Sequence, residues 1–136
     1  MALFLVEAPD HNLAIADAKS ERRKIILDKI GRSLKVDRQK QLYFVHKMSE
    51  KDWYIKSYDR NTSKSRVIIK TLAGSEDFEL LNDGSLIMGK GSIIYHFDPK
   101  NFQDWKPILD LSQYGIDNIS RISARKNRLV IVDQKT

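Results

Sequence analysis

The sequence of 136 residues contains no cysteine and only three prolines and six glycines. The absence of cysteine excludes a disulfide framework and the zinc and iron–sulfur sites that use thiolate ligands. The longest uncharged apolar run, Ala2 to Val6, is far shorter than the roughly 20 residues of a membrane-spanning helix. The first residues have no basic segment, and Glu7 and Asp10 soon follow, so we expect no secretory signal peptide within this chain.

Charged residues are abundant and mostly basic. The chain holds 24 lysines and arginines against 18 aspartates and glutamates, a net charge of +6, and its isoelectric point is near 9.5. With 41% apolar and 31% charged residues, the composition is typical of a folded globular protein rather than a disordered one. The basic balance is compatible with nucleic acid or an anionic membrane as partner, but it selects neither.

Short apolar runs recur with a period of about 42 residues. One family of runs begins with leucine, at Leu3, Leu42, Leu86 and Leu129. A second family ends with aspartate, at Asp17, Asp59 and Asp98. A third family follows each aspartate after a polar turn, starting at Lys24, Arg66 and Lys106. Because three independent markers keep one period, we infer that the chain is built from a repeated unit.

Each run has the character of a β-strand, being short, rich in β-branched and aromatic residues, and bounded by turn formers. Asn82 to Ser85 predicts a tight hairpin around Gly84, and the three aspartates can accept backbone N–H groups at the start of their turns. The stretch from Ala14 to Lys29 is the best helix candidate, but its charged block followed by an apolar block lacks a helical stripe. We therefore predict an all-β fold.

A repeat of four antiparallel strands with this period is the unit of a β-propeller blade. With the strands of a blade lettered a to d from inside to outside, the chain reads b-c-d, a-b-c-d, a-b-c-d, a-b. The prediction is one partial β-propeller domain over residues 1–136, with about three four-stranded antiparallel blades and a remnant strand pair. Its segments are residues 1–33, 34–77, 78–118 and 119–136.

Five stretches have the order and spacing of a known family; they are Leu13–Asp17, Ile30–Leu34, Phe44–Lys47, Leu72–Phe78 and Asp83–Gly89. With these stretches the chain resembles the TolB-like, WD-repeat-like propellers of bacterial envelope proteins, which carry PD40-type repeats. The likeness covers almost the whole chain and is to the C-terminal half of such a propeller. Two of the three a–b turns lack the family's glycine, and the tryptophan–aspartate signature of eukaryotic WD repeats is missing.

The resemblance implies a non-catalytic scaffold for protein–protein or ligand interaction, periplasmic or in the cell envelope, with no cofactor. A family propeller has about twice as many blades, and an open three-blade arc exposes two apolar faces, which forfeits on the order of 10 kcal/mol. Three arrangements follow. The chain is part of a longer propeller, it closes a ring as a homodimer, or it persists as an open arc.

In propellers the d–a and b–c loops share one face, called here the top face, and we expect partner contacts there. The candidate residues are Asp10, His11, Arg32, Ser33, His46, Glu50, Trp53, Ser75, Glu76, Asp77 and Arg121. The alternative is that these side chains only form a solvated rim. Trp53 is expected either to pack between blades or to anchor a partner.

The motifs of catalysis and metal binding are absent. There is no Gly-x-Ser-x-Gly elbow. Glu76 and Asp77 are adjacent, so their side chains are expected to point apart and to form a poor acid/base pair. The histidines lack a third ligand at metal-binding spacing, and Gly89 to Ser92 resembles a phosphate loop without the helix that should follow. We expect no enzyme activity and no metal. The alternatives are a propeller segment that accompanies a hydrolase or peptidase domain, and a basic binder of nucleic acid or an anionic surface.

Basic residues concentrate in the turns at the opposite end of the predicted strands, called here the lower face. These turns hold 14 of the 24 lysines and arginines but only 7 of the 18 acidic residues. The candidate residues are Arg22, Arg23, Lys24, Arg60, Arg66, Arg125, Lys126 and Arg128. They either keep the hairpin tips soluble and free of edge pairing or face an anionic membrane or acidic partner.

Overall fold

The computed structural model describes residues 2–7, 11–17, 19, 20 and 22–135, which form thirteen strands and one short 3₁₀ helix, η1 (Ser112–Tyr114). The strands are β1 (Ala2–Glu7), β2 (Asn12–Asp17), β3 (Arg23–Leu27), β4 (Ile30–Val36), β5 (Leu42–Lys47), β6 (Trp53–Asp59), β7 (Lys64–Lys70), β8 (Phe78–Leu80), β9 (Leu86–Lys90), β10 (Ile93–Phe97), β11 (Lys106–Asp110), β12 (Ile119–Arg125) and β13 (Arg128–Asp133). The all-β class predicted from the sequence is confirmed.

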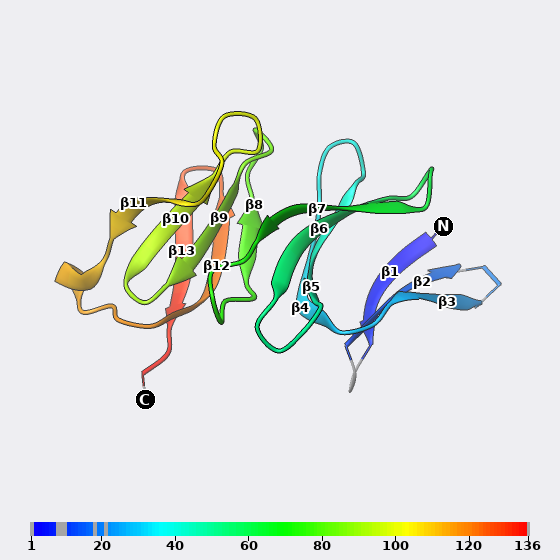
Figure 1. The fold of residues 1–136 in the computed structure, drawn as a ribbon, viewed down its shortest axis with the longest axis horizontal. Coiled ribbons are helices and arrows are strands. Elements are labelled where there is room, and N and C mark those ends of the chain that lie inside the picture. The colour runs from blue at the N-terminus through cyan, green and yellow to red at the C-terminus, as the bar shows by residue number, and fades with distance from the viewer. Residues whose placement is uncertain (1, 8–10, 18, 21, 136) are drawn as a thin grey trace.

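The strands form four antiparallel sheets that follow one another along the chain (Figure 1). The first sheet is β1-β2-β3, the second β4-β5-β6-β7, the third β8-β9-β10-β11 and the fourth β12-β13, and none of them is closed. Within each sheet, every strand pairs with the strand that follows it in the sequence, so each sheet is a meander of hairpins. The four sheets contain three, four, four and two strands in chain order, the same numbers as in the strand pattern read from the sequence repeat.

The turns form as the aspartates and glycine predict. Asp17, Asp59 and Asp98 each accept the backbone N–H two residues further on, at 2.8–2.9 Å, at the start of a hairpin turn. The turn between β8 and β9 contains Gly84 with φ of +87°, a left-handed conformation that glycine adopts without strain. Asp83 closes this turn by accepting the backbone N–H of Ser85 at 2.9 Å.

One stretch expected as a connection is in fact part of a strand. β4 begins at Ile30, so Arg32 and Ser33 lie inside it and the expected segment boundary at 33/34 falls within a strand. Arg121 lies within β12, which begins at residue 119, where the fourth predicted segment begins. The pairing register shifts between Ile30 and Leu34 in β4, and between Ile119 and Arg121 in β12. In β4 the backbone continues the sheet through this irregularity, although the sequence there is typical of a loop.

Buried side chains lie between each sheet and the next. The cluster between the first and second sheets contains Leu13, Ile30, Leu42, Phe44 and Tyr58. The cluster between the second and third sheets contains Val45, Ile55, Phe78, Leu86, Met88 and Phe97. The cluster between the third and fourth sheets contains Ile87, Ile94, Ile119 and Ile122. The core is therefore a series of interfaces between successive sheets, and each sheet is held by its neighbours.

Candidate functional site

The first strands of the second, third and fourth sheets meet through the carboxylate of Asp77, which lies in the connection just before β8. Ser33 of β4 donates its hydroxyl to Asp77 Oδ1 across 44 residues of sequence. On the other side, the backbone N–H of Ile122 in β12 donates to Asp77 Oδ2 at 2.7 Å, and Nη1 of Arg121 lies 3.9 Å from Oδ1. One carboxylate thus bridges three sheets.

Glu79 repeats this arrangement two residues further along. Its Oε2 accepts the backbone N–H of Ala124 at 3.1 Å, and its Oε1 lies 3.6 Å from Nζ of Lys35. The Glu79 side chain is only 11% exposed, so its charge is balanced by the lysine and by hydrogen bonds, as a buried carboxylate requires. Because Asp77 and Glu79 are both engaged between sheets, they act as structural links.

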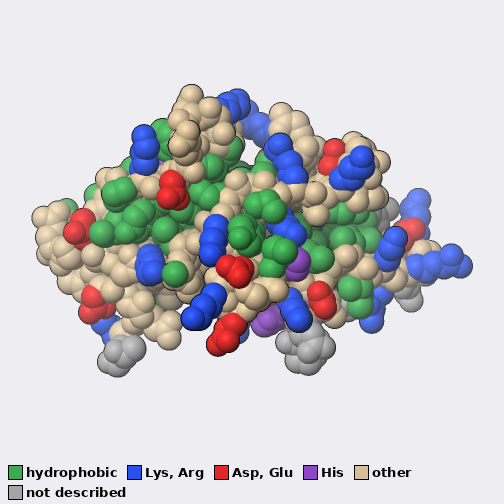
Figure 2. Space-filling view, viewed as in Figure 1, with side chains coloured by type: hydrophobic (Ala, Val, Ile, Leu, Met, Phe, Trp, Pro, Cys, Tyr) green, Lys and Arg blue, Asp and Glu red, His purple; other side chains and the backbone are tan. Residues whose placement is uncertain are grey.

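A polar cavity of about 580 Å³ opens beside these links at the end of the sheets predicted as the top face. Six of the eleven residues predicted for that face line it; they are Arg32, Trp53, Ser75, Glu76, Asp77 and Arg121. Lys47 and Lys90 complete its charged lining. Figure 2 shows basic and acidic side chains intermixed along the lower middle of the molecule, the end at which these loops lie in Figure 1.

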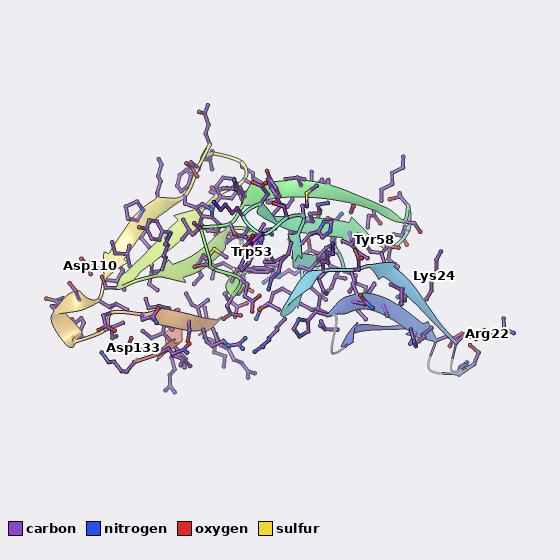
Figure 3. All side chains as sticks on the ribbon, turned by 60° about the horizontal axis from the view of Figure 1, so that its bottom comes forward. Arg22, Lys24, Trp53, Tyr58, Asp110 and Asp133 are labelled. Atoms are coloured by element: carbon purple, nitrogen blue, oxygen red, sulfur yellow. The ribbon has the colours of Figure 1, made fainter. Side chains whose placement is uncertain are left out.

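Lys47 is held between an aromatic ring and a carboxylate. Its Nζ lies 2.5 Å from Glu76 Oε2 and 4.5 Å from the centroid of the Trp53 ring, a cation–π distance. Trp53 starts β6, is partly buried, donates its indole N–H to the Ser49 carbonyl at 3.1 Å and packs against the cluster between the second and third sheets. Trp53, labelled in Figure 3, therefore has a packing role and also lines the cavity.

The cavity carries spare positive charge. Four basic side chains line it, whereas its two carboxylates, Glu76 and Asp77, are already paired with Lys47 and Arg121. Within the described part of the chain, Arg32 and Lys90 make no ion pair, and both are exposed. The arrangement can therefore bind an anionic group such as a carboxylate.

Other predicted top-face residues gather in a neighbouring hollow of about 410 Å³. His11 and Glu50 line it, together with Lys47 and Trp53, which reach both hollows. His46 lies on β5 with its Nδ1 buried and without a hydrogen-bond partner. Burial, reinforced by the nearby charge of Lys56, lowers the pKa of His46 below its ordinary value. Asp10 lies outside the described residues. The hydroxyl of Ser75 donates a hydrogen bond to the backbone carbonyl of Gly89 at 3.0 Å.

The basic residues predicted for the lower face fall into three separate groups. Arg22, Arg23, Lys24 and Arg60 line a shallow hollow beside the first sheet. Arg66 lines a different hollow with Tyr43, and Arg125, Lys126 and Arg128 lie at the β12–β13 turn. Figure 3 shows Arg22 and Lys24 at the far end of the molecule from Asp110 and Asp133. The structure does not gather these residues into one continuous site.

Two further absences concern chemistry and membranes. Within the residues that the structure describes, no three histidine, aspartate or glutamate side chains are placed to hold a metal ion. None of the described residues forms a helix long and apolar enough to span a bilayer.

The sequence-based list of site residues missed Lys47, Lys35 and Glu79. The spacing of 44 residues between Lys35 and Glu79 matches that between Ser33 and Asp77, and it was a signal available in the sequence. Lys47 has no such signal, because its role depends on how two sheets meet. In comparisons with known proteins, no protein-family model and no curated protein sequence matches the chain.

Proposed function

We propose that this chain forms part of a β-propeller, with a three-stranded partial blade, two four-stranded blades and a remnant strand pair, and that it serves as a non-catalytic scaffold that binds a protein partner. The succession of sheets with three, four, four and two strands supports the proposal, because each sheet corresponds to a whole or partial blade. The contacts of Asp77 with Ser33 and Arg121 also support it. Equivalent positions in the innermost strands of successive blades meet in this way around a propeller axis.

The observation that carries the function is the polar cavity with its spare positive charge. Arg32 and Lys47 come from the second sheet, Lys90 from the third and Arg121 from the fourth, so the site depends on the stacking of three sheets. A stiff stack holds these side chains in fixed positions, which reduces the ordering cost when a partner binds. We assign the cavity to an acidic segment of a protein partner. The resemblance to TolB-like propellers supports a location in or near the bacterial envelope.

The assignment is tested with a fluorescently labelled hexaglutamate peptide whose binding is followed by anisotropy at about 50 mM salt, where screening is weak. We expect the double variant Arg32→Ala/Lys90→Ala to weaken binding about tenfold, because two charged contacts are lost. Both side chains are exposed and unpaired within the described chain, so the substitutions should leave folding intact.

The matched control is Lys64→Ala/Lys100→Ala, which removes the same charge from two exposed positions, the first residue of β7 and the turn between β10 and β11. This control variant should bind like the unmodified chain. Equal weakening by both double variants would show binding to overall charge, and failure of the unmodified chain to bind the peptide would refute the assignment. A DNA duplex bound more tightly than the peptide, with the same affinity in all variants, would point to non-specific nucleic-acid binding.

A further inference from the structure

β13 has one open edge. The fourth sheet contains only β12 and β13, and within the described residues no strand pairs with the second edge of β13. In the neighbouring sheet, by contrast, β9 pairs with β8 on one edge and with β10 on the other. The outer edge of β13 therefore presents backbone N–H and C=O groups with which another extended segment can pair.

The β12–β13 hairpin has one packed face and one open face. Ile122 and Ile131 lie opposite each other and pack against the third sheet. On the other face, Val130 and Val132 remain 63% and 49% exposed. Natural edge strands are protected by charges, proline or bulges. β13 has a charged residue at each end, and the register of the hairpin shifts between Ile119 and Arg121, but the central run 129–132 contains neither a charge nor a proline. An edge with these properties has free backbone groups with which a further strand can pair.

The charges around the open face indicate what docks there. Arg125 and Arg128 lie directly opposite each other, and like charges in this position destabilise a hairpin. Arg121 lies opposite Val132 at the other end of the same face. Neither Arg125 nor Arg128 has an acidic partner among the residues described. The exposed valines thus lie between basic ends, a pattern that is complementary to an apolar segment with acidic ends.

A second copy of this chain is a poor match for this face. Each copy carries a net charge of +6, so association brings two basic molecules together. The first sheet also has fewer than four strands, and it presents the exposed basic residues Arg23 and Lys24 on β3. Charge complementarity therefore favours a different, acidic chain.

We propose that β13 binds an extended acidic segment of a partner protein by strand addition. The segment pairs with the open edge through its backbone. Its apolar side chains cover Val130 and Val132, and its carboxylates lie beside Arg125 and Arg128 and beside Arg121. This surface shares Arg121 with the lining of the polar cavity but differs from it in using backbone pairing and an apolar centre.

The test uses a synthetic peptide, Glu-Thr-Val-Thr-Val-Thr-Glu, whose alternation places both valines and both glutamates on one face of a strand. We expect the peptide to slow amide hydrogen exchange in residues 128–133 of the chain. Replacing its central threonine with proline removes a backbone donor and should abolish this protection. The variant Arg125→Gln/Arg128→Gln should weaken binding about fivefold to tenfold, and it removes a like-charge contact, so its folding is not endangered.

Two controls separate this proposal from the function assigned to the cavity. Lys64→Gln/Lys100→Gln removes the same charge elsewhere, and Arg32→Ala/Lys90→Ala alters the cavity, and both should bind this peptide like the unmodified chain. Protection of residues 71–77 instead of 128–133 would overturn the proposal in favour of the cavity. Equal binding of the proline peptide would also overturn it, and protection of 128–133 that grows with protein concentration alone would identify a second copy as the occupant.

Discussion

At the scale of single residues, Gly89 shows how closely the third and fourth sheets approach each other. Gly89 has no positive φ, so its backbone conformation suits any residue. A Cβ atom at this position would lie 3.0 Å from Ile119 Cβ and closer still to Ile119 Cγ2. Ile119 Cβ is fixed by the β12 backbone and cannot move without it, so the lack of a side chain at Gly89 allows β12 to pack on β9.

We predict that Gly89→Ala lowers the free energy of unfolding by about 1–3 kcal/mol, the usual cost of overpacking. Chemical denaturation followed by circular dichroism measures the change. The control is a double-mutant cycle with Ile119→Ala, which removes the closest atom; the two substitutions together should cost less than the sum of their separate effects. Strict additivity would show that the two residues are not in contact.

His46 gives the chain a dependence on pH near neutrality. Burial and the nearby Lys56 lower its pKa in the folded state, while Asp28 opposes them weakly. The unfolded chain, with a histidine pKa near 6.5, therefore binds the proton more tightly than the folded chain. Stability linked to His46 is present above this pH and is lost as the pH falls through the lower folded pKa.

We predict that His46→Gln reduces the loss of stability between pH 7 and pH 5, because this variant has no imidazole to protonate. Denaturation midpoints across that pH range measure the effect. Lys56→Gln, which removes the nearby positive charge, should reduce this pH dependence in part. The same pH dependence in the His46→Gln variant would contradict the role of His46.

At the scale of elements, strands and turns could be predicted because their signals are local. Asp17, Asp59 and Asp98 close their turns with their own side chains, and the runs before and after them are β-branched and apolar. The early start of β4 could not be predicted. Arg32 and Ser33 follow a glycine and lie where the register shifts, so they have the sequence of a loop and the backbone of a strand.

The candidate site shows the same division. Arg32, Glu76 and Arg121 could be placed at one end of the sheets because strand direction alone decides which loops lie together. The link from Asp77 to Ile122 could not, because it depends on how far one sheet is rotated and shifted against the next. Side-chain contacts between sheets are set by tertiary packing. The sequence pattern gives the period of the repeat, but it does not give the geometry with which one sheet packs on the next.

At the scale of the whole molecule, the sheets form a linear stack in which each core cluster joins only two neighbours. Stability in such an arrangement is close to a sum of sheet and interface contributions, as in other repeat proteins. The first sheet is held mainly by the cluster around Leu13, Phe44 and Tyr58, to which the fourth sheet contributes nothing. Damage to one interface should therefore remain local.

We predict that Leu13→Ala, at a fully buried position on β2, loosens the first sheet and leaves the third and fourth sheets protected. The void left by the shorter side chain costs about 2–5 kcal/mol at that interface. Amide hydrogen exchange should therefore accelerate strongly in β1–β3 and weakly, if at all, in β8–β13. Ile108→Ala, at a position that is 57% exposed, is the matched large-to-small control and should change exchange little. If Leu13→Ala accelerates exchange equally in all four sheets, the molecule unfolds as one cooperative unit, and stability is not a sum of separate sheet and interface contributions.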